Sequence, residues 1–141
     1  MTSKIKIFVF LSFFMLSYGC ITIPTSENKV LSGEKITDKQ LVFIEQGITS
    51  KSNIIDKLGL PDIHLIDKNI FTYDWQTRQA IMIWVLPGGA AGAADIPKNY
   101  VLLIRFDVED IVRNHAITKR SLLESYGDHL MEWIQEDEKS E

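Results

Sequence analysis

The side chains that could carry chemistry are few and scattered in this 141-residue chain. Its three histidines, His64, His115 and His129, are far apart and lack the short spacing of metal ligands. No serine stands in the Gly-x-Ser-x-Gly turn that exposes a hydrolase nucleophile. The acidic residues within 107–110 lack the spaced ligands and the terminal glutamate of a calcium loop. The sequence therefore predicts no enzyme activity, no cofactor and no metal site.

One cysteine stands in a context that indicates a specific modification. Cys20 directly follows Gly19, and both come after an apolar run over residues 7–16 that is flanked by Lys4 and Lys6. This run is too short to span a bilayer, which needs about 20 apolar residues. The arrangement resembles the lipobox of bacterial lipoproteins, in which the signal peptide is cleaved before the cysteine and the thiol is acylated.

Acylation of Cys20 would make palmitate-type chains the membrane anchor of the protein. The alternative is an ordinary secretory signal followed by a buried or incidental cysteine. Because the chain has no second cysteine, no internal disulfide can brace the fold. Ile21 follows the cysteine, and an aspartate there would indicate retention at the inner membrane. We therefore expect a signal peptide over residues 1–19 and a lipid anchor on the periplasmic side of the outer membrane.

The mature chain has the length and charge of one acidic domain. Removal of Lys4 and Lys6 leaves 13 basic against 19 acidic residues, a net charge of −6. An acidic surface disfavours binding to the phosphates of nucleic acids, so no nucleic-acid partner is predicted. Residues 20–35 are predicted to be a lipidated flexible tether. Residues 36–118 then form the domain, and residues 119–141 form an amphipathic helix with an acidic tail.

Two short helices are marked by signals at their ends. A capping box at 37–40 predicts the start of the first helix, and Gly47 its end. Ser50 caps the second helix, which Gly59 and Pro61 terminate. Both are too short to persist alone, so they must dock on other elements.

Strand signals follow the second helix. Apolar and polar residues alternate at 71–75, and residues 80–86 are apolar on both faces. Two further strands are predicted at 100–106 and 111–117. The Gly- and Ala-rich stretch 87–99 is predicted to be a long loop. It lacks the Lys-Ser or Lys-Thr of a phosphate-binding loop, and it could lie against a membrane or a protein groove.

The order of these pieces resembles the SmpA/OmlA (BamE-like) family of small outer-membrane lipoproteins. The resemblance rests on the Gly-Ile-Thr-Ser sequence within 44–50, the Leu-Gly-Leu-Pro sequence at 58–61, the aromatic strand 71–75 and the strand 103–107 that ends in Phe-Asp. It implies an α+β fold in which two short N-terminal helices pack on a small antiparallel sheet of three or four strands, related to the β-lactamase-inhibitor-like fold. The long loop and the C-terminal helix depart from the family pattern.

The resemblance also implies a role. The best-known member of the family is an accessory subunit of the outer-membrane β-barrel assembly machine. The leading hypothesis is therefore a lipid-anchored binding or scaffold module with an envelope protein as partner. The alternative is an inhibitor or ligand-binding lipoprotein that uses the sheet face and the loop. The residues predicted to form an interaction surface are Tyr73, Trp75, Trp84, Gly88, Gly89 and Gly92.

Overall fold

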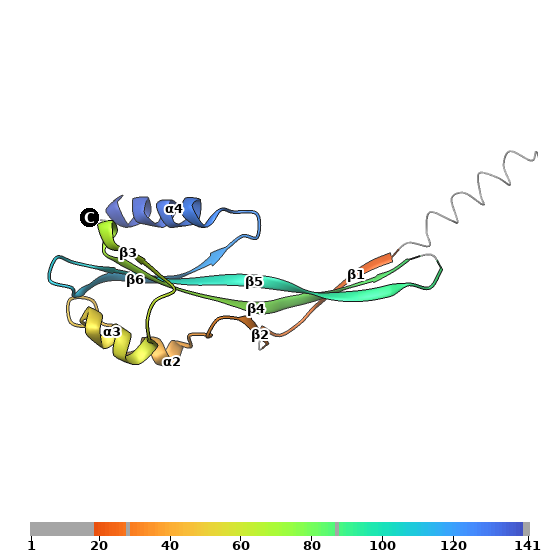
Figure 1. Cartoon of the computed structure of the whole chain (residues 1–141), viewed down its shortest axis with the longest axis horizontal. Coiled ribbons are helices and arrows are strands. Elements are labelled where there is room, and N and C mark those ends of the chain that lie inside the picture. Colours follow the sequence, from red (N-terminus) through yellow and green to blue (C-terminus); the bar gives the residue numbers. More distant parts are fainter. Residues whose placement is uncertain (1–18, 28, 87, 140–141) are drawn as a thin grey trace, which may run out of the picture. The chain divides into compact units, whose positions relative to one another are not determined.

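A computed structural model describes residues 19–27, 29–86 and 88–139. The predicted signal peptide lies outside the described residues, except for Gly19. The elements in chain order are β1 (Gly19–Pro24), β2 (Val30–Ser32), α2 (Asp38–Leu41), α3 (Lys51–Leu58), β3 (Ile63–Leu65), the 3₁₀ turn η1 (Ile66–Lys68), β4 (Ile70–Val85), β5 (Ala91–Phe106), β6 (Val112–Arg120) and α4 (Tyr126–Lys139) (Figure 1).

The strands form one antiparallel sheet, in which β1, β4, β5 and β6 are successive neighbours and β2 and β3 also pair with β4. The chain divides into two compact units. The described part of unit 1 is 19–27 and 78–96 without residue 87. Unit 2 contains the described residues of 28–77 and 97–141. The division falls within β4 and within β5.

The predicted fold class is wrong. The sheet has six strands rather than three or four. The first predicted helix is only one turn, α2, which contains no buried residue. The chain is mostly sheet because the predicted tether contributes β1 and β2, and the predicted loop contributes the first part of β5. The C-terminal helix α4 is confirmed.

One face of the sheet in unit 2 packs around aromatic side chains. Phe71, Tyr73 and Trp75 alternate along β4 and are buried. Ile54 of α3 has no exposed surface and packs in the same cluster. The cluster is completed by residues of β5, β6 and the segment before α3, namely Ile36, Ile44, Leu102, Ile104, Phe106 and Val112.

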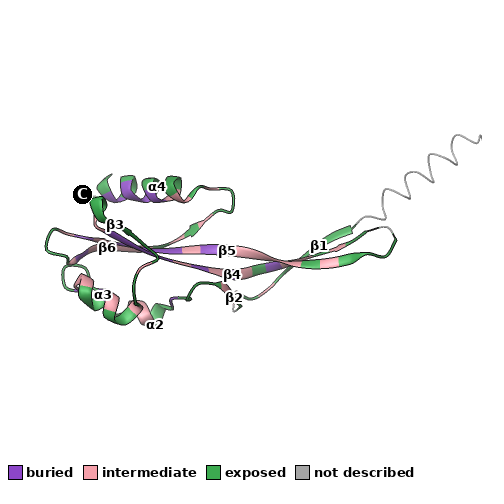
Figure 2. Cartoon of the chain, viewed as in Figure 1, coloured by how far each residue is buried: buried purple, intermediate pink, exposed green. Residues whose placement is uncertain are grey.

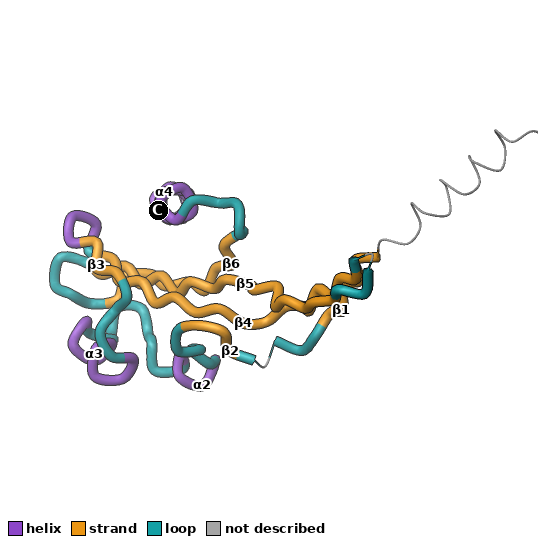
Figure 3. The backbone as a smooth tube through the Cα atoms, turned by 45° about the vertical axis from the view of Figure 1, so that its right-hand side comes forward, coloured by secondary structure: helices purple, strands orange, loops and turns teal. Residues whose placement is uncertain are grey.

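The opposite face in unit 2 is covered by α4. Leu130, Trp133 and Ile134 of this helix are buried against Val101 and Leu103 of β5. Figure 3 shows α4 and α3 on opposite sides of the strands of unit 2, and Figure 2 shows buried residues in the strands between them. The apolar residues that recur at helical spacing in the tail therefore belong to the core.

Acidic residues at 107–110 stabilise the turn between β5 and β6. The Asp107 carboxylate accepts hydrogen bonds from the backbone N–H groups of Glu109 and Ile111, at 2.8 and 3.0 Å. Asp110 has a positive φ of 60° and pairs with Lys51 of α3 at 2.9 Å. These carboxylates therefore hold the turn and attach it to α3.

The second predicted helix is confirmed together with both of its ends. Ser50 Oγ accepts a hydrogen bond from the Asn53 N–H at 3.3 Å, as expected of a cap. Gly59 has φ +83° and ψ −171°, and its N–H donates to the Ile55 carbonyl at 2.9 Å. This region of φ and ψ is essentially restricted to glycine.

Replacement of Gly59 by alanine is expected to lower the free energy of unfolding by about 2 kcal/mol. An added Cβ would have no atom within 4 Å, so the cost is backbone strain alone. Chemical denaturation measures it. The control is Gly127→Ala in α4, where no positive φ is recorded and alanine favours the helix. Equal stability of Gly59→Ala and the wild type would contradict the strain at this helix end.

Candidate functional site

Cys20 lies in unit 1, in the edge strand of the described sheet. Its free thiol is exposed, and β1 pairs antiparallel with β4 so that Cys20 is opposite Trp84 and Gly19 is opposite Val85. The predicted tether therefore begins as an ordered strand. Its residues pair through the backbone, which requires no particular side chains.

One face of this strand pair is aliphatic and exposed to solvent. Ile21 is opposite Ile83 and Ile23 is opposite Ile81, and side chains of directly opposed residues share a face. The exposed fractions are 64% for Ile21, 44% for Ile23 and 37% for Ile83. Val85, at 49% exposed, extends this face toward the turn. β1 is exposed along its whole length (Figure 2).

The other face carries Trp84, one of the predicted surface residues. Trp84 is half-buried because its ring lies against Gly92 of β5. A Cβ at position 92 would approach the ring of Trp84 so closely that the ring must move. Gly92 is therefore a close-contact position in a strand, and its role in the chain is to accommodate the indole.

The turn that joins β4 to β5 carries the other two predicted glycines. Gly88 and Gly89 are exposed and have φ of +92° and +87°. The turn is closed by a hydrogen bond from the Leu86 N–H to the Ala90 carbonyl at 2.7 Å. The predicted long loop 87–99 is thus wrong beyond Ala90, because residues 91 onward pair as a strand.

Tyr73 and Trp75, by contrast, belong to the core of unit 2. Their exposed fractions are 5% and 4%. Trp75 stacks on Tyr100 with ring centroids 5.4 Å apart, and the Tyr73 hydroxyl donates to the Gly59 carbonyl at 3.0 Å. Burial raises the pKa of Tyr73 to about 12. Neither ring is available as an interaction surface.

Unit 2 has a pocket of about 190 Å³ that the sequence did not indicate. Asn99 of β5 and Arg120 of β6 are directly opposite each other and both line it. Within the described residues, Asn99 Oδ1 and Arg120 Nε are buried without a hydrogen-bond partner. The lining also includes Ser32, Ile63, Asp74, Trp75, Gln76, Tyr100 and Tyr126.

Two ionisable groups of the pocket have altered acidity. Burial raises the pKa of Asp74, and the nearby positive charge of Arg120 opposes that change. Burial also raises the pKa of Tyr126 to about 12, and its hydroxyl donates to Thr72 Oγ1 at 2.7 Å. The pocket therefore combines a cation, a carboxyl that is more easily protonated than usual, and an amide oxygen that can accept a hydrogen bond.

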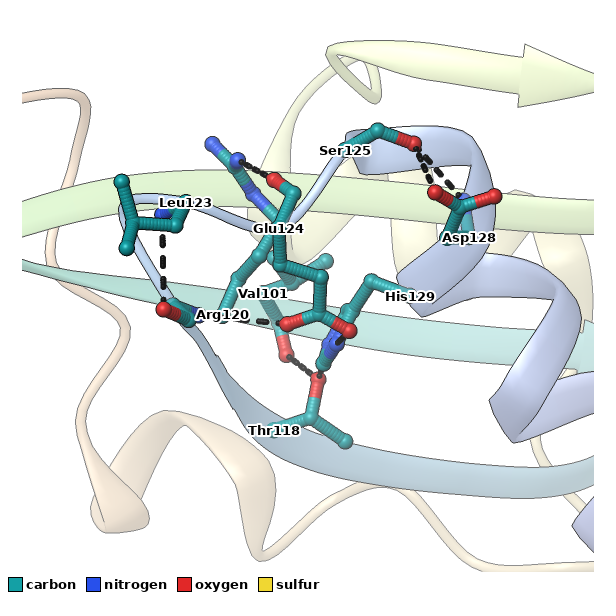
Figure 4. A network of polar contacts seen from close by, with 9 residues as sticks. Val101, Thr118, Arg120, Leu123, Glu124, Ser125, Asp128 and His129 are labelled. Atoms are coloured by element: carbon teal, nitrogen blue, oxygen red, sulfur yellow. Dashed lines mark hydrogen bonds and ion pairs between the residues drawn. The ribbon is translucent and has the colours of Figure 1, made fainter.

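A hydroxyl, an imidazole and a carboxylate also meet in unit 2 (Figure 4). His129 Nε2 lies 2.7 Å from Thr118 Oγ1, and His129 Nδ1 lies 3.1 Å from Glu124 Oε1. This order is the one that activates a hydroxyl in hydrolases. Here Thr118 is half-buried in β6, and neither it nor His129 lines the pocket just described. The contacts connect the start of α4 to the strand.

This network could not be predicted from the sequence. Thr118 is in a strand, and Glu124 and His129 are five positions apart, on either side of the start of α4. His64 lies in β3, and His115 lies in the same strand as Thr118, β6. Over the described residues, no group of three or more His, Cys, Asp and Glu side chains could hold a metal ion. The predicted absence of enzyme activity and of a cofactor stays a prediction.

Within the same residues, no helix has the length and apolar character needed to cross a membrane. Comparison of the chain with protein-family models, with curated proteins and with solved structures gave no match.

Proposed function

We propose that this protein is a lipid-anchored binding module on the periplasmic side of the outer membrane, attached through Cys20. The observation that carries the proposal is the Gly19-Cys20 junction directly after the apolar run 7–16. The exposed thiol of Cys20 supports it, since an acylated cysteine must be free of core packing.

Unit 2 supports binding as the task of the module. It has two core clusters on opposite faces of its sheet, and so it presents a stable surface. The idea of an envelope-protein partner comes from the residue pattern shared with the SmpA/OmlA family. The fold implied by that family gives it no support, since the sheet here is different.

Crosslinking in intact cells followed by affinity purification tests the binding role. We expect tagged wild-type protein to capture one or a few envelope proteins reproducibly. An unrelated outer-membrane lipoprotein with the same tag is the control for crowding at the membrane. The proposal of a binding module fails if both proteins capture the same set.

A ligand-binding lipoprotein is the second candidate, and the pocket of unit 2 favours it. The unpartnered Asn99 Oδ1 and Arg120 Nε could accept from and donate to an amide group of a ligand. Titration of the protein with free amino acids and short peptides, followed by NMR chemical shifts, tests this candidate. Saturable shifts that disappear in Arg120→Gln would support it, and their absence from the wild type would remove it.

A further inference from the structure

The turn end of unit 1 combines exposed aliphatic side chains with an absence of charge. Val85 and Leu86 are 49% and 50% exposed, next to the exposed Ile21 and Ile83. No charged residue occurs in 79–94. Scattered exposed hydrophobic residues need no explanation, but a contiguous group marks a surface that another apolar phase covers.

In the described part of unit 1, the charged residues lie at the other end of the strands. Arg78 and Asp95 form an ion pair at 3.5 Å across β4 and β5, and Glu27 ends the segment after β1. The polarity of unit 1 therefore changes along its strands, from charged at Arg78 to apolar at Leu86.

The register places Cys20 close to the apolar end. Cys20 is opposite Trp84, and Trp84 is only two residues before Leu86, where the turn begins. A strand rises about 3.3 Å per residue, so the turn starts within roughly 7 Å of Cys20 along the strand. Acyl chains on Cys20 cannot enter a bilayer without bringing this turn to the membrane surface.

We infer that unit 1 inserts its turn end, namely Val85, Leu86 and residues 88–90 together with Ile21 and Ile83, into the interfacial layer of the bilayer. This inference rests on the proposed acylation of Cys20. Trp84, level with the anchor, is of the residue type enriched at membrane–water interfaces. Among the described residues, the outer edge of β1 has no strand partner. Insertion therefore stops at the interfacial layer, because the hydrocarbon core does not tolerate unpaired backbone groups.

Site-specific fluorescence tests the inference on the acylated full-length protein. Because the Cys20 thiol is consumed by acylation, a second cysteine is the single free thiol for an environment-sensitive label. Val85→Cys reports on the turn end. Gln79→Cys is the matched control, since Gln79 is exposed in the same strand and lies about 20 Å away from position 85. Both variants are reconstituted in vesicles of phosphatidylethanolamine and phosphatidylglycerol.

We expect lipids with a shallow doxyl group to quench the label at 85 several-fold more than the label at 79, and aqueous iodide to do the reverse. Equal access of iodide to both labels would overturn the inference. Shielding at 85 without doxyl quenching would also overturn it, because a second copy or another protein would then cover this surface.

The mass of the N-terminal peptide shows whether Cys20 is acylated. It therefore tests the proposed anchor separately from the insertion of the turn. An acylated peptide with an exposed label at 85 overturns only the insertion of the turn. A peptide without acyl chains overturns the proposed anchor and the insertion together. Thermal melts of the labelled variants show that each is folded, and both positions are exposed, so little destabilisation is expected.

Discussion

A Cys20→Ser variant is expected to incorporate no labelled palmitate and to lose its membrane attachment completely. The hydroxyl of serine does not replace the thiol in lipoprotein maturation. Each methylene of an acyl chain contributes about 0.8 kcal/mol when buried in the bilayer, and stable anchoring takes two chains or a second membrane-binding feature. The apolar turn end alone is too small to keep the protein at the membrane.

Two versions of the serine variant are needed to interpret this result. In the first, Cys20→Ser behind the natural segment 1–19 is tested for palmitate incorporation, with Thr22→Ser in the same strand as control. In the second, 1–19 is replaced by an ordinary secretory signal, so that an uncleaved signal peptide cannot hold the serine variant at the membrane. Palmitate on the serine protein, or membrane pelleting of its cleaved form, would contradict the anchor.

The capped helix α3 could be predicted because its signals are local. Ser50 and Gly59 act on groups within a few residues of themselves. The first helix ends earlier than predicted because a residue after it competes for the backbone. Thr49 Oγ1 donates to the Phe43 carbonyl at 2.8 Å and accepts from the Glu45 N–H at 2.9 Å, and these bonds replace the continuation of the helix.

The strand at the start of β5 could not be predicted from its own residues. Glycine and alanine are depleted in strands, because they offer little side chain to pack. What makes 91–96 a strand is pairing with β4, where Gly92 leaves space for Trp84. The pocket and the network of Thr118, Glu124 and His129 could not be predicted either. Their residues come together only when the strands pair in the observed register.

The second large effect concerns the attachment of α4. Asp137 in the last turns of this helix is only 7% exposed. Its Oδ2 lies 2.6 Å from Nη1 of Arg105 in β5, and its Oδ1 accepts a hydrogen bond from Asn114 in β6. A carboxylate near a helix C-terminus is unfavourable on its own. The two strand partners therefore account for its presence there.

Replacement of Asp137 by alanine is expected to lower the free energy of unfolding by about 3 kcal/mol, because it leaves the guanidinium of Arg105 without its main partner. This corresponds to a fall in melting temperature of roughly 10 °C. The matched control is Glu138→Ala. Glu138 is exposed and lies 3.5 Å from Arg105 Nη2, so its loss should cost about 0.5 kcal/mol. Equal effects of the two variants would contradict a specific contribution of Asp137.

The pH dependence gives an independent check on the same contact. Burial by itself raises the pKa of Asp137, but hydrogen bonds from Asn114 and Arg105 and the positive charges of Arg105 and Arg113 lower it below the ordinary value. A lowered pKa in the folded state stabilises the protein fully above the pKa of the unfolded chain, about 3.9. That stabilisation disappears as the pH falls through the folded-state pKa. The difference in unfolding free energy between the wild type and Asp137→Ala should therefore be constant near neutral pH and decrease below about pH 4. A difference that stays constant throughout the acid range would show that Asp137 acts through packing rather than through its charge.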